Sequence, residues 1–299
     1  DKYSALKTSG TYLENEISSL KLADEPHNLF DPLRYFLSLG GKRMRPILTL
    51  LSSEIFHTPK EESVCAALSL ELFHNFSLIH DDIMDEAPVR RGKPTVHQKW
   101  NSSVAILSGD ALYIAGYQQL SKYSDQRLPL LLQRFNETAI EVCQGQQMDM
   151  DFENRADVTL NEYIEMIRLK TSVLLAGAMQ IGAHIGGADK KNRELIYEFG
   201  ENTGIAFQLL DDYLDAFGEQ AKVGKITGGD IIADKKTYLQ ILALQQATDT
   251  DAEVLKYWLG KKPKDPTEKV KAVMTIFEKL NIGEQLLETR LPPQSKPST

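Results

Sequence analysis

The sequence predicts an all-α fold, arranged as one helical bundle with a cavity between opposing helices. Apolar residues recur with helical periodicity along almost the whole chain, and no segment alternates convincingly between apolar and polar residues as a half-buried strand does. No repeat, low-complexity linker or sharp change in composition divides the 299 residues. We therefore predict a single domain over residues 1–299, in which helices from distant parts of the sequence can face each other across the cavity.

The first third of the chain contains four predicted helices. Residues 12–22 form an amphipathic opening helix, and residues 32–39 and 46–56 lie on either side of a glycine pair. Residues 62–84 are apolar on nearly every side, which is typical of a central, buried helix.

The rest of the chain continues the helical pattern, with Pro and Gly clusters between the segments. Further helices are predicted over residues 103–123, 128–150, 160–186, 191–217, 236–248, 251–260 and 266–280. The last nine residues hold three prolines, so we predict an irregular tail over about 290–299.

Composition excludes several classes of function. A net charge of -8 argues against nucleic acid as a partner, because binding to a phosphate backbone needs a basic face. No apolar block resembles a signal peptide or an integral membrane segment, so we expect a cytoplasmic protein. Cys65 and Cys143 lie in apolar helical patterns without metal-ligand spacing, so we expect small buried side chains rather than a disulfide or a zinc site.

Two aspartate-rich runs with the same DDxxD spacing are the strongest functional signal. The first is Asp81, Asp82 and Asp85, and the second is Asp211, Asp212 and Asp215. On a helix, residues four apart share a face, so the outer two aspartates of each run stand together. Mg²⁺ takes one or two carboxylates together with waters and phosphate oxygens of a substrate. A solvated acidic helix end is the alternative for a single run, but the matched pair favours bound metal.

Basic residues near both runs indicate an anionic ligand. The segment 40–46 (GGKRMRP) places three cations in a turn where glycines permit close approach of the backbone. A second group, residues 90–93 (RRGK), begins five residues after Asp85. Lys225 and Lys235 follow the second run more loosely. Each basic turn alone is typical of a solvated surface, but cations after both runs favour a diphosphate, whose oxygens arginine and lysine bind well.

Together, these motifs resemble the trans-isoprenyl diphosphate synthases, the polyprenyl synthetase family that includes farnesyl and geranylgeranyl diphosphate synthases. The resemblance covers about residues 30–240. It rests on GGKRMRP (40–46), LIHDDIMD (78–85), RRGKPT (90–95), GQQMD (145–149), LKT (169–171), FQLLDDYLD (207–215) and the lysines of GK (224–225) and DKKT (234–237). It implies the isoprenoid synthase type of all-α bundle around a deep cavity, usually in a homodimer.

The resemblance also implies a role for individual residues. About three Mg²⁺ ions per active site would be held by the six aspartates, with Asp212 and Asp215 bound more loosely. The residues that would grip the allylic diphosphate are Arg90, Lys170, Lys225 and Lys235. The residues that would bind isopentenyl diphosphate are Gly41, Lys42, Arg45, His74 and Arg91. Thr171 and Gln208 would lie near the reacting carbons, and Gln146 and Asp149 would line the cavity. For His74 and Gln146, ordinary core packing is the alternative.

The implied enzyme is a short-chain prenyltransferase. Ionisation of the allylic diphosphate gives a carbocation, the double bond of isopentenyl diphosphate attacks it, and proton loss regenerates an allylic product. The alternatives are a class I terpene cyclase, which would not need the cations of residues 40–46, and a noncatalytic subunit of a heteromeric prenyltransferase, which would be expected to lose part of one motif.

Residues before the first run bear on product length. Phe76 and Phe73 precede Asp81 by about 7 and 12 Å of helix, and Ser77 lies one turn before Asp81. In the family, a bulky residue five before the first aspartate accompanies short products. The combination of Phe76 with Ser77 resembles makers of twenty-carbon geranylgeranyl diphosphate more than makers of fifteen-carbon farnesyl diphosphate. Ordinary core packing of both phenylalanines is the alternative.

Overall fold

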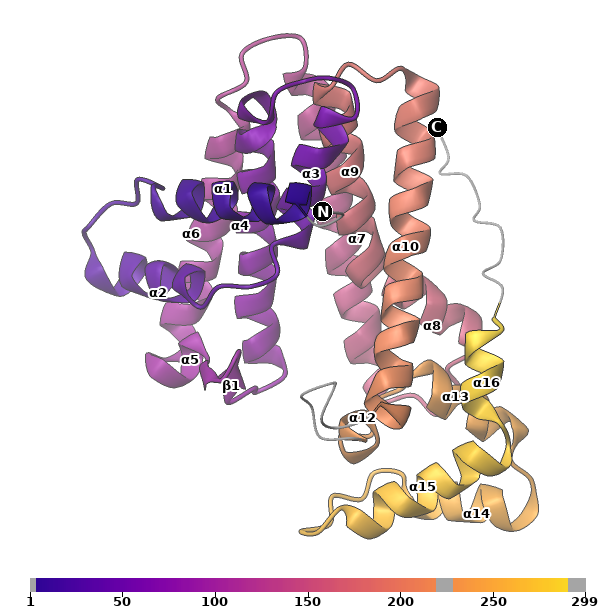
Figure 1. Cartoon of the computed structure of the whole chain (residues 1–299). Helices are drawn as coiled ribbons and strands as arrows, with labels where there is room; N and C mark the ends of the chain where they lie inside the picture. The colour runs from indigo at the N-terminus through magenta and orange to yellow at the C-terminus, as the bar shows by residue number, and fades with distance from the viewer. Residues whose placement is uncertain (1–3, 219–227, 290–299) are drawn as a thin grey trace. The chain divides into compact units, whose positions relative to one another are not determined.

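The computed structural model describes residues 4–218 and 228–289, and helices dominate them (Figure 1). Within these residues the strands are β1 (Val89–Arg90) and β2 (Lys93–Pro94), which form one antiparallel hairpin. The predicted all-α class is therefore confirmed. The chain divides into two compact units, one formed by residues 1–140 and 174–200 and the other by residues 141–173 and 201–299. A single domain over residues 1–299 stays a prediction.

The first unit contains the N-terminal helices. These are α1 (Ser4–Ser18), α2 (His27–Ser38), α3 (Met44–Glu54), α4 (Lys60–Met84), α5 (Val96–Lys99) and α6 (Ser102–Leu120). The first half of α7 (Leu128–Glu153), nearly all of α9 (Val173–Ile185) and the start of α10 (Lys190–Phe217) complete it. In Figure 1, α4 runs through this unit with α3 and α6 alongside. Its residues from Ala66 to Phe73 are all buried, which confirms the predicted central helix.

Helices α4 and α6 pack closely because two glycines remove side chains from their contact. A Cβ on Gly109 would lie 2.5 Å from the His80 ring, and a Cβ on Gly116 would lie 3.1 Å from the carbonyl of Ser69. Moving forward along α6 therefore means moving backward along α4, so the two helices are antiparallel. This fixes which side chain of α6 meets each turn of α4.

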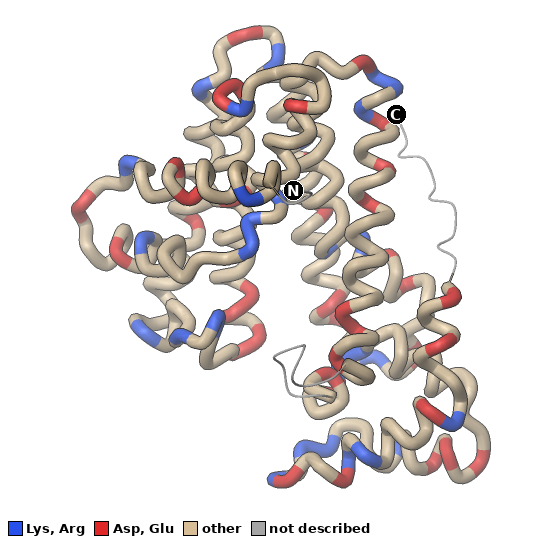
Figure 2. The backbone as a smooth tube through the Cα atoms, in the orientation of Figure 1, with Lys and Arg blue, Asp and Glu red and all other residues tan. Residues whose placement is uncertain are grey.

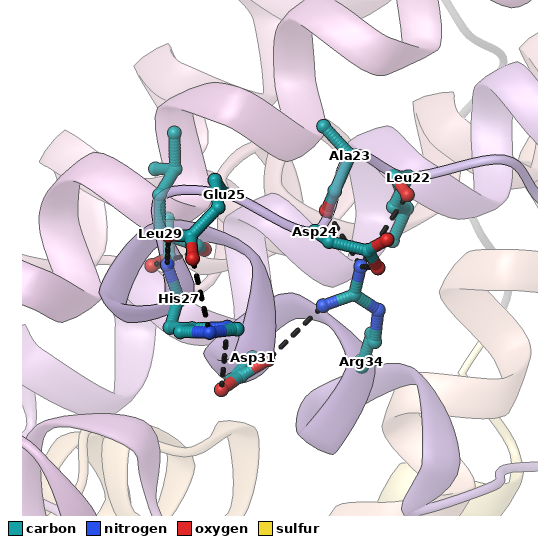
Figure 3. A network of polar contacts seen from close by, with 9 residues as sticks. Leu22, Ala23, Asp24, Glu25, His27, Leu29, Asp31 and Arg34 are labelled. Atoms are coloured by element: carbon teal, nitrogen blue, oxygen red, sulfur yellow. Dashed lines mark hydrogen bonds and ion pairs between the residues drawn. The ribbon is translucent and has the colours of Figure 1, made fainter.

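The connection between α1 and α2 is held by a polar network around Arg34 (Figure 3). Its guanidinium donates to the carbonyls of Leu22 and Ala23 and to the carboxylates of Asp24 and Asp31. The network stabilises a loop that has no helix or strand of its own.

The second unit is formed by the later helices. It contains the second half of α7, most of α10, and the elements α8 (Leu160–Ile167), η1 (Arg168–Ser172), α12 (Gly229–Ile232), α13 (Tyr238–Gln246), α14 (Asp249–Trp258), α15 (Thr267–Lys279) and α16 (Ile282–Leu287). A capping box at Thr159 and Glu162 begins α8. The core of this unit includes Ile205, Phe277 and Ile282, all at most 1% exposed.

The predicted helix over residues 160–186 is helical from Leu160 to Ile185, but the prediction missed a change of helix type in its middle. The segment η1 is one turn of π-helix that separates α8 from α9. Because α9 is apolar on most sides, it hides the change of register that the wider turn causes. Such turns occur often at functional sites, and this one carries Lys170 and Thr171.

Helix starts were also predicted imperfectly. Helix α2 begins at His27 rather than at residue 32, and Pro32 lies inside it. Pro32 cannot donate a backbone hydrogen bond within the helix. Leu33, Phe36 and Leu37 next to it are buried. Helix α3 begins at Met44, which places Pro46 in its first turn, where proline is tolerated.

The cysteines and the helix hydrophobicity give two further results. Cys65 and Cys143 are free cysteines, and the prediction that both side chains are buried was wrong, because Cys65 is half-buried and Cys143 is exposed. No helix among residues 4–218 and 228–289 combines the length and the apolar character that a membrane span needs.

Candidate active site

The first aspartate run lies at the C-terminal end of α4, where Figure 2 shows acidic residues gathered. Asp82 is buried, and both of its carboxylate oxygens accept hydrogen bonds from Nε of Arg90 at 2.9 Å. A guanidinium nitrogen of Arg90 lies 2.8 Å from the same carboxylate. Asp85 is exposed and Asp81 is half-buried. Asp82 is therefore bound within the protein, whereas the two outer aspartates lie closer to solvent.

The glycine-rich turn between α2 and α3 contains a buried cation. Arg43 adopts a left-handed backbone conformation (φ 47°) and is 5% exposed. Its guanidinium donates to Glu71 at 2.6 Å, to Glu14 at 2.8 Å and to the carbonyl of Leu37 at 2.9 Å. With its donors directed inward, Arg43 fixes the turn to α1 and α4. The flanking Lys42 stays exposed.

Arg45 and His74 form a polar pair next to this turn, with 3.0 Å between Nη1 and Nε2. Burial and the nearby charges of Arg45 and Arg91 hold the pKa of His74 well below its usual range. His74 is therefore a neutral imidazole, and its Nε2 accepts from Arg45. Burial also lowers the pKa of Arg45. The pair gives His74 a defined polar partner, beyond ordinary core packing.

Arg91 reaches the same turn from the β1–β2 hairpin. Its guanidinium donates to the carbonyl of Gly40 and lies against Gly41. A Cβ on Gly41 would lie 2.8 Å from that guanidinium, and the φ of Gly41 is 149°. Only glycine therefore fits at this position without a shift of Arg91. The structure brings Gly41, Arg45, His74 and Arg91 together.

The second aspartate run lies at the C-terminal end of α10, in the second unit. Asp212 is 4% exposed and accepts hydrogen bonds from the Tyr163 hydroxyl at 2.5 Å, from the Tyr238 backbone at 3.3 Å and from Gln208 at 3.4 Å. These donors are neutral. The pKa of Asp212 is raised to about 7, mainly by burial and also by the charge of Asp230, while the hydrogen bonds that Asp212 accepts oppose the rise.

The outer aspartates of this run differ from each other. Asp215 is buried and accepts from the backbone N–H of Asp230 at 2.9 Å. Asp211 is half-buried. Asp230 also lies 3.5 Å from Nζ of Lys235, whose side chain is 67% exposed. Burial raises the pKa of Asp230. Lys225, predicted to grip diphosphate, lies outside the described residues.

The π-turn η1 holds Lys170 against the second half of α7. Nζ of Lys170 donates to Asp149 at 2.6 Å. A Cβ on Gly145 would lie 2.2 Å from the backbone nitrogen of Lys170, so α7 and η1 approach each other at that glycine. Gly204 approaches Ser172 from α10 in the same way. Thr171, which follows Lys170, and Gln146, which follows Gly145, are both half-buried.

Carboxylates of this kind suit a divalent metal, because Mg²⁺ prefers oxygen ligands. Among residues 4–218 and 228–289, no group of three His, Cys, Asp or Glu side chains is arranged to hold an ion by itself. Asp82, Asp212 and Asp215 are already hydrogen-bonded within the protein. The arrangement fits an ion that takes its remaining ligands from water and from phosphate oxygens of a substrate.

The predicted chain-length residues lie in an aromatic cluster of the first unit. Phe73 and Phe76 have ring centroids 5.6 Å apart, and both contact Tyr113 of α6. Phe73 is 1% exposed, and Phe76 and Ser77 are half-buried. The hydroxyl of Ser77 donates to the carbonyl of His74.

Several residues of the site were missed from the sequence. Tyr163 and Tyr238 support Asp212 from elements 49 and 26 residues away. Lys269 is almost fully buried, and its Nζ lies 2.7 Å from Oδ1 of Asp234, the residue that precedes Lys235. Neither tyrosine nor Lys269 belongs to a charged motif, so no local pattern indicates them. Gly145, which brings α7 close to η1, lies inside the GQQMD motif and is the one missed residue that a sequence motif contains.

Comparison with known proteins gives a consistent result. Residues 26–277 match the family model described as polyprenyl synthetase. The geranylgeranyl diphosphate synthase of Methanosarcina mazei is 40% identical over 248 residues, 82% of this chain and 76% of that protein. A short chain isoprenyl diphosphate synthase of Methanocaldococcus jannaschii is 40% identical over 240 residues, 80% of this chain and 73% of that protein.

Solved structures agree with the sequence relatives. A crystal structure of geranylgeranyl pyrophosphate synthase aligns with a TM-score of 0.90 and 46% sequence identity, covering 95% of this chain and 88% of that chain. The matched region of the family model includes both aspartate runs, the glycine-rich turn and η1. The predicted resemblance is confirmed, and the chain belongs to the polyprenyl synthetase family.

Proposed function

We propose that this protein is a short-chain prenyl diphosphate synthase that joins isopentenyl diphosphate to an allylic diphosphate and makes geranylgeranyl diphosphate. One observation supports this most strongly. His74, with its arginine partner, and Asp81 lie seven residues apart on α4, which places them on nearly the same face about 10 Å apart. One helix face thus carries a cationic site for one diphosphate and a carboxylate site for a metal-bound second one.

The cationic site suits isopentenyl diphosphate, which keeps its diphosphate throughout the reaction. Lys42, Arg45 and Arg91 would bind its oxygens, and a neutral His74 can donate through the ring nitrogen that does not accept from Arg45. Because Arg43 is held by Glu14 and Glu71, the turn is preorganised before the substrate arrives.

The carboxylate site suits the allylic diphosphate. Divalent metal bound there, about three Mg²⁺ ions, would supply Lewis-acid stabilisation of the leaving diphosphate. Asp81, Asp85 and Asp211 would be the direct ligands because they are more exposed than Asp82, Asp212 and Asp215, which are buried and would orient them. Arg90, Lys170, Lys225 and Lys235 would bind diphosphate oxygens.

The reaction then needs no protein nucleophile. The allylic C–O bond breaks and its electron pair leaves with diphosphate. The double bond of isopentenyl diphosphate forms the new C–C bond, and a proton passes from the resulting cation to the released diphosphate. Thr171 and Gln208 would lie beside the reacting carbons, with Gln146 and Asp149 further along the cavity. Exclusion of water protects the cation.

A homodimer is part of the proposal. Helix α6 is apolar nearly all round, and Ile106, Leu107 and Ile114 are 46–59% exposed on it. Exposed apolar surface of this kind is typical of a protein interface. A cytoplasmic location stays a prediction.

The test is incubation of the purified protein with Mg²⁺, isopentenyl diphosphate and, separately, dimethylallyl, geranyl or farnesyl diphosphate. We expect release of diphosphate and a twenty-carbon prenyl diphosphate on chromatography. No product with any of the three primers would overturn the proposal. A hydrocarbon product without diphosphate would instead indicate a terpene cyclase, which the family match does not favour.

A further inference from the structure

We propose that Tyr113 of α6 is a specificity-determining residue that forms the second barrier to chain growth, behind Phe76. The inference rests on the proposed function and concerns the apolar end of the same site. It differs from the sequence-based expectation that the deeper barrier is Phe73, one turn further along α4.

The exposure of the rings separates these two candidates. Phe73 is 1% exposed and packs against Phe135, which is also 1% exposed, with ring centroids 5.6 Å apart. Both rings are therefore enclosed by other side chains. Phe76 and Tyr113 are each half-buried. Tyr117 of the same cluster is also half-buried, but Tyr113 is the half-buried tyrosine that stacks on Phe76, so it is the ring that a growing prenyl chain would reach next.

Phe76 and Tyr113 form a stack. Their centroids lie 5.0 Å apart with 20° between the ring planes. An apolar chain that extends along α4 from Asp81 meets Phe76 first, about 7 Å of helix away. If the Phe76 ring is removed, the next surface it meets is the face of Tyr113 that the stack had covered.

The Tyr113 ring is fixed at its hydroxyl end. Tyr117 donates to Oδ1 of Asn136 at 2.5 Å, so its single proton is used there. The 3.3 Å contact between the two tyrosine hydroxyls therefore has Tyr113 as donor. The chain from Tyr113 through Tyr117 to Asn136 ties α6 to α7 and holds the ring across the path.

The backbone of α4 and α6 also limits relaxation. Gly109, one turn before Tyr113, brings the two helices so close that a Cβ there would lie 3.6 Å from the Phe76 ring and 2.5 Å from His80. The tyrosine therefore cannot move aside without separating two tightly packed helices.

The experiment compares product lengths for single and double variants with farnesyl diphosphate as primer. Phe76→Ala alone is expected to lengthen the product slightly or broaden its distribution. Phe76→Ala with Tyr113→Ala is expected to lengthen the main product by at least one more isoprene unit. The matched double variant, Phe76→Ala with Phe73→Leu, is expected to give the distribution of Phe76→Ala alone.

Further variants separate the role of the ring from effects on folding. Tyr113→Phe keeps the ring and is expected to keep the wild-type product, whereas Tyr113→Leu replaces Tyr113→Ala if that variant does not fold. Gln118→Ala, at an exposed position of the same helix, is the neutral control. Thermal unfolding followed by circular dichroism identifies variants that are not folded.

Two results would overturn the inference. One is a product of the Phe76→Ala, Tyr113→Ala double variant that is no longer than that of Phe76→Ala. The other is a product of Phe76→Ala with Tyr113→Phe that is as long as the product of Phe76→Ala with Tyr113→Ala. Failure of the proposed function itself would look different, because the wild-type protein would then form no prenyl diphosphate with any primer.

Discussion

The two aspartate runs have the same spacing but different electrostatic surroundings. In the first, buried Asp82 is paired with the guanidinium of Arg90. In the second, buried Asp212 accepts from neutral groups, above all the Tyr163 hydroxyl, and its pKa rises to about 7. Equal spacing along a helix therefore does not give equal charge. The partners come from other elements and decide whether the middle carboxylate is an ion near neutral pH.

The difference indicates a division of labour within each run. The middle aspartates are buried and hydrogen-bonded, which is typical of groups that orient metal ligands. The first aspartates, Asp81 and Asp211, are both half-buried and lie nearer to solvent. Mutations can test this division and the contrast between the two runs.

The largest expected effect is on activity. Asp81→Ala removes a proposed direct ligand and should lower kcat by about 10³-fold or more. Asp212→Asn removes only a supporting charge and should lower it about 10–100-fold. Diphosphate release at saturating Mg²⁺ and substrates measures both. Equal losses in the two variants would show that direct and supporting carboxylates are not distinct.

The next effect is on stability and should differ between the two middle aspartates. Asp82→Asn places an amide against Arg90, breaks a largely buried ion pair and should cost on the order of 3 kcal/mol. In Asp212→Asn, the amide oxygen can still accept from Tyr163 and Tyr238. That variant should lose about 1 kcal/mol or less at pH 8, or become more stable.

The raised pKa of Asp212 decides in which direction its contribution to stability changes with pH. The folded protein binds the Asp212 proton more tightly than the unfolded chain, so this stabilisation is complete below about pH 4 and is lost as pH rises through about 7. Urea unfolding with a chelator present, at pH 5 and pH 8, measures it. If Asp212→Asn were as destabilised as Asp82→Asn at pH 8, the contrast between the runs would be wrong.

The smallest expected effect concerns pH and His74 in the first unit. Its pKa is lowered in the folded protein, so the unfolded chain binds more protons, and stability that is present above about pH 6.5 is lost as pH falls. His74→Gln should reduce the change in the free energy of unfolding with pH by at most about 1.4 kcal/mol per pH unit. Urea unfolding between pH 5 and 8 measures it, with His57→Asn, at an exposed position, as the control. An unchanged slope would contradict a neutral buried imidazole.

Much of the fold was predictable because long helices repeat their burial every few residues. The central helix α4 ends at Met84, the residue where its pattern predicted an end. The turn η1 was not predictable, because α9, which follows it, is apolar on most sides and hides the change of register that one extra residue causes. The start of α2 was missed because a proline inside a helix reads as a helix start.

The candidate site was predictable where its residues form local motifs. Both aspartate runs, the cations of residues 40–46 and the Lys170 segment were read directly from the sequence. Tyr163, Tyr113 and Lys269 were not, because each acts on a residue at least 35 positions away in the sequence. Partners that lie far apart in the sequence of one chain have no signature in that sequence alone.

The sequence by itself determined the all-α class, the family and the identity of the charged groups, because periodicity and motif spacing are local properties. The tertiary structure decided which of these charges are buried and what neutralises each one. It paired Asp82 with Arg90, gave Asp212 a tyrosine, directed Arg43 inward and stacked Tyr113 on Phe76. The physical reason is that desolvation and side-chain contact depend on neighbours that only folding brings together.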